Sequence, residues 1–132
     1  MAAEVTTPGG DVCTLCLWLA DTPDRRGRGL MGVTDLGPAD GMVFRLEIPS
    51  TSSFYMLDTP LPLSIAFFAA DGSFVSAIDM APCLDVPAGD CPRYAAAGPF
   101  TEAIEVPAGE LDDLGIEPGA RLVVLDEPCP PS

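Results

Sequence analysis

The sequence predicts a mainly β protein: one antiparallel domain of the jelly-roll-like sandwich or distorted-barrel type, with two short helices. Three observations carry this expectation. Apolar residues occur in short stretches that alternate with polar residues, which is typical of half-buried strands. The 15 prolines and 13 glycines lie between these stretches and therefore mark turns. The dipeptide Asp71-Gly72 is a strong signal for a two-residue hairpin.

The first part of the chain contains two expected strands and one expected helix. Residues 12–20 (VCTLCLWLA) are predicted as the first strand, because turn-forming residues stand on both sides. Residues 23–31 follow as a helix of about two turns, with Thr22 as its N-cap and Gly32 at its end. Residues 42–48 (MVFRLEI) alternate with a period of two and predict the second strand.

Five further strands and a helix are expected in the rest of the chain. Strands are predicted at residues 54–57 and 63–70, separated by a proline-rich junction. The Asp-Gly hairpin leads into a strand at residues 74–80, and residues 100–106 alternate like another strand. A short helix at residues 107–114 and a closing strand at residues 120–125 complete the set; both lie near the end of the chain.

Length and charge limit the classes of function. The 132 residues fit one domain, with a core expected at about residues 12–125 and flexible ends at residues 1–10 and 126–132. The net charge of -14 repels nucleic-acid phosphates and anionic lipid, so we expect no nucleic-acid partner. No apolar run approaches the roughly 20 residues of a membrane span, and no export signal is recognisable. We expect no membrane insertion and a soluble protein, cytoplasmic, or extracytoplasmic if a leader was removed.

Two missing residue types narrow the chemistry. The chain has no histidine and no lysine, which excludes serine-histidine and cysteine-histidine nucleophile pairs, Schiff bases and histidine-ligated metals. We therefore expect no cofactor, and a non-catalytic domain that binds a small ligand or a protein partner. The alternative is a hydrolase or lyase that uses the carboxyl groups of Asp58 or Glu105 as acid or base.

Five cysteines are many for this length, and their odd number leaves at least one unpaired within the chain. Cys83 and Cys91 bracket a short turn-rich loop, which favours a disulfide over two thiols or a metal site. Cys13 and Cys16 lie on the first expected strand and should point to opposite faces, which argues against a redox dithiol. Cys129 lies in the proline-rich tail.

We expect no metal site. The acidic residues lack the spacing of a calcium-binding loop. Met31, Met42 and Met56 could meet Cys16 as soft ligands of copper(I), but methionines in such places more often fill gaps in a core.

Five ordered motifs are similar to those of a known family. They are Arg28-Gly29-Leu30-Met31; Gly41-Met42-Val43-Phe44; Phe54-Tyr55-Met56 with Thr59, Pro62, Leu63 and Ile65; Glu105-Val106 with Gly109; and Gly115-Ile116 with Gly119. Over about residues 12–125 the sequence thus resembles the family named domain of unknown function 192. The resemblance implies a compact, mostly antiparallel β fold of jelly-roll or distorted-barrel type and implies no activity.

The chain departs from this family pattern at two polar positions. Asp58 stands where the family more often has asparagine, and Ser64 stands where it more often has aspartate. Chemistry that needs a carboxylate at position 64 is therefore not available here. A hydrogen-bonding role for Asp58 together with Ser64 remains open.

The candidate ligand site is a polar pocket in which Arg28 and Glu105 meet Asp58, Thr59 and Ser64. A structural alternative stays open for each of these residues. Asp58 and Thr59 precede a proline, where such side chains commonly cap turns. Arg28 has an equally plain alternative as the ion-pair partner of Glu105 or Asp58.

Two further groups have a ligand-binding and a structural interpretation. Tyr55 and Tyr94 offer stacking surface for a flat ligand, although a partly buried tyrosine with a satisfied hydroxyl is more common. Arg25 and Arg26 could dock an anionic group, although a solvated helix face explains them as well.

Overall fold

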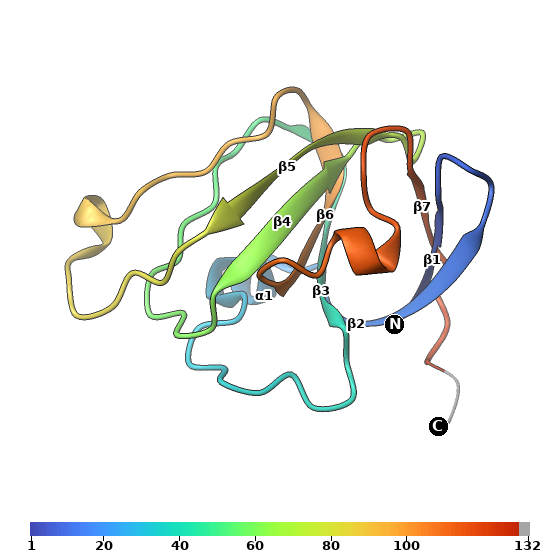
Figure 1. Ribbon diagram of the computed structural model, residues 1–132. Helices are drawn as coiled ribbons and strands as arrows, with labels where there is room; N and C mark the ends of the chain where they lie inside the picture. The colour runs from blue at the N-terminus through green and yellow to red at the C-terminus, as the bar shows by residue number, and fades with distance from the viewer. Residues whose placement is uncertain (130–132) are drawn as a thin grey trace.

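The protein is mainly β, and Figure 1 shows its strands curling around one side of the molecule with a single α-helix beside them. The computed structural model describes residues 1–129. Its seven strands form one half-barrel sheet in the order β5-β4-β6-β3-β2-β1-β7. The strands are β1 (Ala2–Thr6), β2 (Val12–Ala20), β3 (Gly41–Ser50), β4 (Leu63–Phe68), β5 (Phe74–Met80), β6 (Phe100–Pro107) and β7 (Arg121–Val124). The helices are α1 (Pro23–Arg28) and two single 3-10 turns, η1 (Ala88–Asp90) and η2 (Asp112–Leu114).

One pair of neighbouring strands is parallel. The sequence predicts an antiparallel sheet, and five of the strand pairs agree, but β2 and β3 run in the same direction. Parallel neighbours need a crossover connection, and residues 21–40, which contain α1, provide it. The crossover therefore places α1 beside the sheet.

The two edges of the sheet meet at one end, which is why it resembles a barrel. The backbone N–H of Leu122 donates to the carbonyl of Gly72 (2.8 Å), and that of Phe74 donates to the carbonyl of Ala120 (3.1 Å). These bonds join the start of β5 to β7, whereas the rest of β5 pairs with β4 alone.

Both faces of the sheet carry an apolar core. The inner core lies within the curl of the sheet and includes Leu15, Leu17, Val43, Phe68, Ile104 and Leu122. The outer core lies on the opposite, outer face of β3, β4 and β6, under α1 and the long loops. It includes Phe44, Met56, Leu63, Phe67 and Phe100. The apolar residues of β4 alternate between the two cores, and all six residues of the strand are buried.

The N-terminal end is part of the sheet. The sequence predicts a flexible end at residues 1–10, but Ala2–Thr6 form β1, which pairs with both β2 and β7. Ala3 and Val5 are fully buried in the inner core. The small side chains of this segment gave no strong strand pattern, and its order comes from strands that are distant in sequence.

Other predicted elements are present with different lengths. Strands β2 and β5 have the predicted bounds. The helix predicted at residues 23–31 ends at Arg28, and residues 54–57 form isolated bridges only. The helix predicted at residues 107–114 is reduced to η2, because Gly109 adopts a left-handed φ of 87°. Within the described chain, no helix is long and apolar enough to cross a membrane.

Two disulfides tie loops and the tail to the sheet. Cys83 and Cys91 are joined to each other, and Cys16 on β2 is joined to Cys129, a pairing that the sequence analysis does not predict. Cys13 points to the other face of β2 and is a free thiol. The disulfide at Cys16 removes the thiolate that the copper alternative requires. The same disulfide fixes Cys129, which belongs to the end predicted to be flexible, residues 126–132. Residues 130–132 of this end lie outside the described residues.

Candidate functional site

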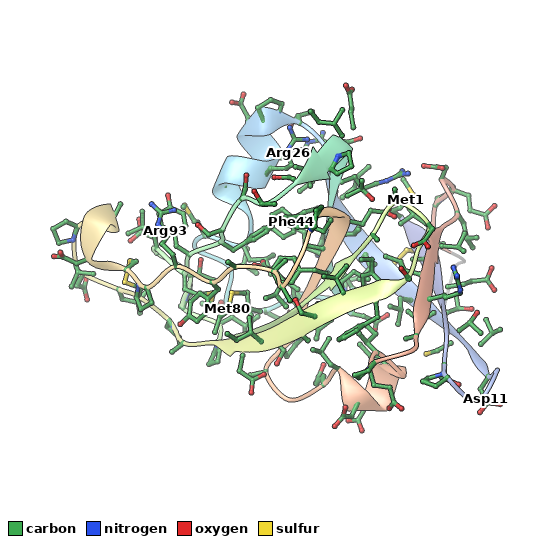
Figure 2. All side chains as sticks on the ribbon, turned by 90° about the horizontal axis from the view of Figure 1, so that it is seen from above. Met1, Asp11, Arg26, Phe44, Met80 and Arg93 are labelled. Carbon is green, nitrogen blue, oxygen red and sulfur yellow. A yellow bond between two sulfur atoms is a disulfide. The ribbon has the colours of Figure 1, made fainter. Side chains whose placement is uncertain are left out.

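A cavity of about 320 Å³ opens on the outer face of the sheet. Its walls come from α1 and the turn after it, from β3 and β6, and from the loops that contain Tyr55 and Arg93. In Figure 2, Arg26 lies above Phe44 and Arg93 lies to the left of Phe44. We call this cavity the arginine pocket, because it is lined by Arg26, Arg28 and Arg93, three of the six arginines of the chain.

The end of α1 and the turn after it place Arg28 at the pocket and bury the side chain of Leu30 in the core. The Thr22 hydroxyl accepts a hydrogen bond from the Arg25 backbone N–H (3.2 Å) and so caps the helix start. At the helix end Gly29 adopts φ 50° and ψ -128°, a conformation that essentially only glycine reaches. A Cβ at Gly29 would lie 3.3 Å from the ring of Phe44. The sharp turn leaves Arg28 exposed and buries Leu30 in the core.

The arginines of the pocket have no acidic partner. Within residues 1–129 the salt bridges of the protein use Arg25, which pairs with Asp21 (3.7 Å), and Arg45, which pairs with Glu102 (3.2 Å) and with Asp126. These arginines do not line the pocket. Of the four arginines that form no salt bridge among the described residues, three line the pocket; the fourth, Arg121, does not.

Two of the pocket arginines are held in place by other contacts. The guanidinium of Arg26 donates to the backbone carbonyl of Arg45 (3.0 Å). The guanidinium carbon of Arg93 lies 4.5 Å from the centroid of the Tyr55 ring, which is a cation–π contact. Both contacts orient a side chain without neutralising its charge.

Glu105 is the buried polar group of the pocket. It lies on β6 between Met42 of β3 and Ile65 of β4, and it is only 4% exposed. Burial alone raises the pKa of this carboxyl to about 8. Among the described residues, no hydrogen-bond donor reaches the carboxyl and no salt bridge contains it. At neutral pH Glu105 is therefore mostly protonated and uncharged.

A close approach of two strands explains why β3 begins with a glycine beside Glu105. A Cβ at Gly41 would lie 2.0 Å from the backbone carbonyl oxygen of Glu105. Only glycine allows β3 to come this near to β6 at that point. The motif Gly41-Met42-Val43-Phe44 thus fixes the strand that carries Glu105.

One wall of the arginine pocket is aromatic. The rings of Phe44 and Phe54 are 5.1 Å apart between centroids, and those of Phe54 and Phe100 are 5.9 Å apart. Phe44 and Phe100 are almost fully buried. The pocket thus combines an apolar wall with a few polar groups, which is the usual composition of small-molecule sites.

Four of the residues predicted for the site come together in this pocket. They are Arg28, Tyr55, Thr59 and Glu105. The Thr59 hydroxyl donates to the carbonyl of Leu57 (3.0 Å), so it also has the predicted turn-capping bond. The alternative ion pair between Arg28 and Glu105 is not formed.

Asp58 and Ser64 are not among the residues that line the pocket. Asp58 adopts a left-handed φ of 53°, and its backbone N–H donates to the carbonyl of Cys83 (3.1 Å). Ser64 donates to Asp79 (2.5 Å) and accepts from the Gly109 N–H (3.1 Å). Both residues hold loops in place, Asp58 through its backbone and Ser64 through its hydroxyl.

The sequence signals for the remaining site residues were weak. Arg26 was assigned either to solvent or to an anionic ligand, and it lines the pocket, whereas Arg25 does not. Arg93 was not predicted at all, because nothing in the sequence relates its loop to α1. Tyr94 accepts a hydrogen bond from the Ala81 N–H (3.3 Å) and packs against the outer core, so its contacts are structural.

The arrangement suits an anion better than a cation. Within residues 1–129, no group of three or more histidine, cysteine or acidic side chains is placed to hold a metal ion. Guanidinium groups bind carboxylate and phosphate oxygens through paired hydrogen bonds.

Comparisons with known proteins agree with this fold and name no activity. Residues 4–124 match the model of the DUF192 family, which is described as "Uncharacterized ACR". No curated protein matches the chain. A crystal structure from Sinorhizobium meliloti 1021, described as a candidate transcription regulator, is 28% identical, with a TM-score of 0.80 over 92% of this chain and 91% of that one.

A second crystal structure, of a protein of unknown function from Novosphingobium aromaticivorans DSM 12444, is 30% identical. Its TM-score is 0.80, over 94% of this chain and 84% of the other. The family match begins within β1 and ends within β7, so it takes in every strand of the half-barrel. The chain belongs to the DUF192 family.

Proposed function

We propose that the protein binds a small organic anion in the arginine pocket and performs no chemistry on it. The observation that carries this proposal is that three arginines without acidic partners line one cavity in a chain with a net charge of -14. The overall field of such a chain repels anions. A site that captures an anion therefore needs a local group of cations such as this one.

The shape of the site favours a small molecule over a protein partner. The cavity of about 320 Å³ is at the lower end of the range of small-molecule sites, roughly 300–1,000 Å³. Its aromatic wall can bury the apolar part of a ligand while the guanidinium groups hold the charge. A protein partner would instead be expected to use an exposed apolar area, and Phe44 and Phe100 are not exposed.

The charge also argues against a role on DNA. One similar structure is described as a candidate transcription regulator. In the present chain 20 acidic residues outnumber six basic ones, so duplex DNA would be repelled. We therefore propose ligand binding without a nucleic-acid partner.

The test is a binding screen with a matched control on the same helix. Organic carboxylates, phosphate esters and sulfate esters are screened by thermal shift, and the dissociation constant of each hit is then measured. Arg28→Gln and Arg93→Gln should each weaken binding by about 10- to 100-fold, the value of one charge-assisted hydrogen bond. Arg25→Gln removes the same charge from α1 outside the pocket and should change the affinity less than about 2-fold.

Two results would overturn the proposal. One is that no compound in the screen binds. The other is that hits lose as much affinity in Arg25→Gln as in Arg28→Gln, because binding would then depend on net charge and not on the pocket.

A second candidate function rests on Glu105. A buried carboxyl with a pKa of about 8 in a pocket has the character of a general acid, as a hydrolase or lyase would need. Asp58, the other candidate, is not among the pocket residues. Turnover of a hit compound that fell at least about 100-fold in Glu105→Gln, with binding retained, would favour this enzyme over the binding domain.

A further inference from the structure

The polar side chains of the arginine pocket differ in how far they are buried. Arg28 and Arg93 are exposed, Arg26 is half-buried, and Glu105 is 4% exposed. Among the described residues, no salt bridge joins an arginine of the pocket to Glu105, so the guanidinium nitrogens lie more than 4.0 Å from the carboxyl oxygens. The pocket therefore has a charged mouth and an uncharged polar floor.

The surroundings of the floor keep the carboxyl uncharged. Its neighbours on β3 and β4 are Met42 and Ile65, which carry no charge. The charged or titratable groups that share the pocket are Arg26 and Arg28 from α1, and Tyr55 and Arg93 from the loops; the hydroxyl of Thr59 is neutral. That hydroxyl already donates to the carbonyl of Leu57 and is not available as a donor to Glu105.

A protonated carboxyl has one O–H donor, and among the described residues the side chain of Glu105 forms no hydrogen bond and no salt bridge. The carboxyl lines the cavity, so a bound molecule can reach it, and a molecule that supplies an acceptor for the O–H gains a hydrogen bond. Phe44, Phe54 and Phe100 line the same cavity, so the same molecule needs an apolar or flat middle between its two polar ends.

We propose that the pocket takes a bipolar ligand: an organic anion whose carboxylate or phosphate lies among the arginines and whose opposite end presents an uncharged oxygen or nitrogen acceptor to Glu105. This inference rests on the proposed function, because it assumes that the arginines bind the anionic end. It adds the requirement for a neutral acceptor at the far end. Acids with a distal keto, ether or amide oxygen belong to this class, and simple fatty or aromatic acids do not.

Three small probes separate the two requirements. 4-Acetylbenzoate has the anion, a flat middle and a distal carbonyl acceptor. 4-Ethylbenzoate has the same shape without the acceptor, and methyl 4-acetylbenzoate has the acceptor without the charge. At about pH 6 the wild-type protein should bind 4-acetylbenzoate about 5-fold more tightly than 4-ethylbenzoate, as expected for one hydrogen bond.

Substitutions at Glu105 and a change of pH identify the donor. At about pH 9.5 the carboxyl is ionised and can no longer donate, so the preference for the ketone should disappear. Glu105→Gln keeps an N–H donor at every pH and should keep the preference at both pH values. Glu105→Leu has no donor and should show no preference at either pH, provided that its circular dichroism spectrum matches that of the wild type.

The outcomes distinguish this inference from the proposed function. Equal affinity of the wild type for the ketone and the ethyl compound at about pH 6, with both weakened by Arg28→Gln, would overturn the bipolar ligand and leave the anion site standing. Equal binding of the methyl ester and the free acid would overturn the anion site. If neither carboxylate binds, both proposals are wrong.

Discussion

Replacing Glu105 by glutamine should stabilise the protein at neutral pH, and the gain should grow with pH. The amide has nearly the same shape as the carboxyl but never ionises. In the folded protein burial raises the pKa of Glu105 from 4.5 to about 8. In the unfolded chain the same carboxyl is exposed to water and titrates near its ordinary value.

The sign follows from proton linkage. Below the unfolded pKa both states hold the proton, and the protonated carboxyl favours neither. Between the two pKa values only the unfolded state ionises, so stability falls as pH rises, by about 1.4 kcal/mol per pH unit. The loss is about 3 kcal/mol at pH 7 and reaches about 5 kcal/mol above the folded pKa.

The assay is urea unfolding of the wild type and Glu105→Gln at several pH values, with the disulfides intact. Other carboxylates titrate alike in both proteins, so the difference between the two free energies of unfolding isolates Glu105. This difference should rise in favour of the variant from about pH 5 to pH 8 and then stay level. A difference independent of pH would refute the reasoning, and a change in the opposite direction would mean that Glu105 is ionised beside an arginine.

Three other predictions test the construction of the fold. Gly41→Ala should lower the free energy of unfolding by about 3 kcal/mol or more, because its Cβ would overlap the carbonyl oxygen of Glu105; chemical denaturation measures this, and a loss within about 0.5 kcal/mol would contradict it. Ser64→Ala leaves the Gly109 N–H without its acceptor and should cost about 1–3 kcal/mol in the same assay, whereas an unchanged midpoint would show that the bond is not formed. Thiol titration of the unfolded, unreduced protein should count one free thiol, that of Cys13, and a count of five would exclude both disulfides.

Elements with strong local patterns could be predicted from the sequence. β2 has turn residues on both sides, and β5 follows the Asp71-Gly72 hairpin; both have the predicted bounds. β1 could not be predicted, since its five residues are ordered by pairing with strands that include β7 at the far end of the chain. The parallel pair of β2 and β3 was missed for a similar reason, because the direction of a crossover depends on packing.

The sequence predicts the strand β6 but not which side of the sheet each of its side chains faces. A strict period of two places Phe100 and Ala103 on opposite faces, but both belong to the outer core. The pairing of β3 with β6 shifts in register between Arg45 and Ser50, which is a bulge or similar irregularity. Such a shift changes which residues face each side, and it leaves Glu105 on the pocket face.

The candidate site was predicted where motifs and chemistry coincided. Arg28 and Glu105 belong to two of the family-like motifs and are predicted as members of a polar pocket, and both line the arginine pocket. The alternative ion pair between them is not formed, because Arg28 is exposed and Glu105 is buried, and the sequence does not show this difference in burial. Arg93 reaches the site through the loop that follows the Cys83–Cys91 disulfide, which no local pattern indicates.

The central claim, that the arginine pocket binds a small organic anion, is tested most directly by an NMR titration of the nitrogen-15-labelled protein with 4-acetylbenzoate. We predict saturable shifts of the backbone amides of Gly27, Gly29, Ser53 and Tyr55, which line the pocket, and little change around Gly10 and Gly115. Absence of saturable shifts, or largest shifts away from the pocket, would contradict the account.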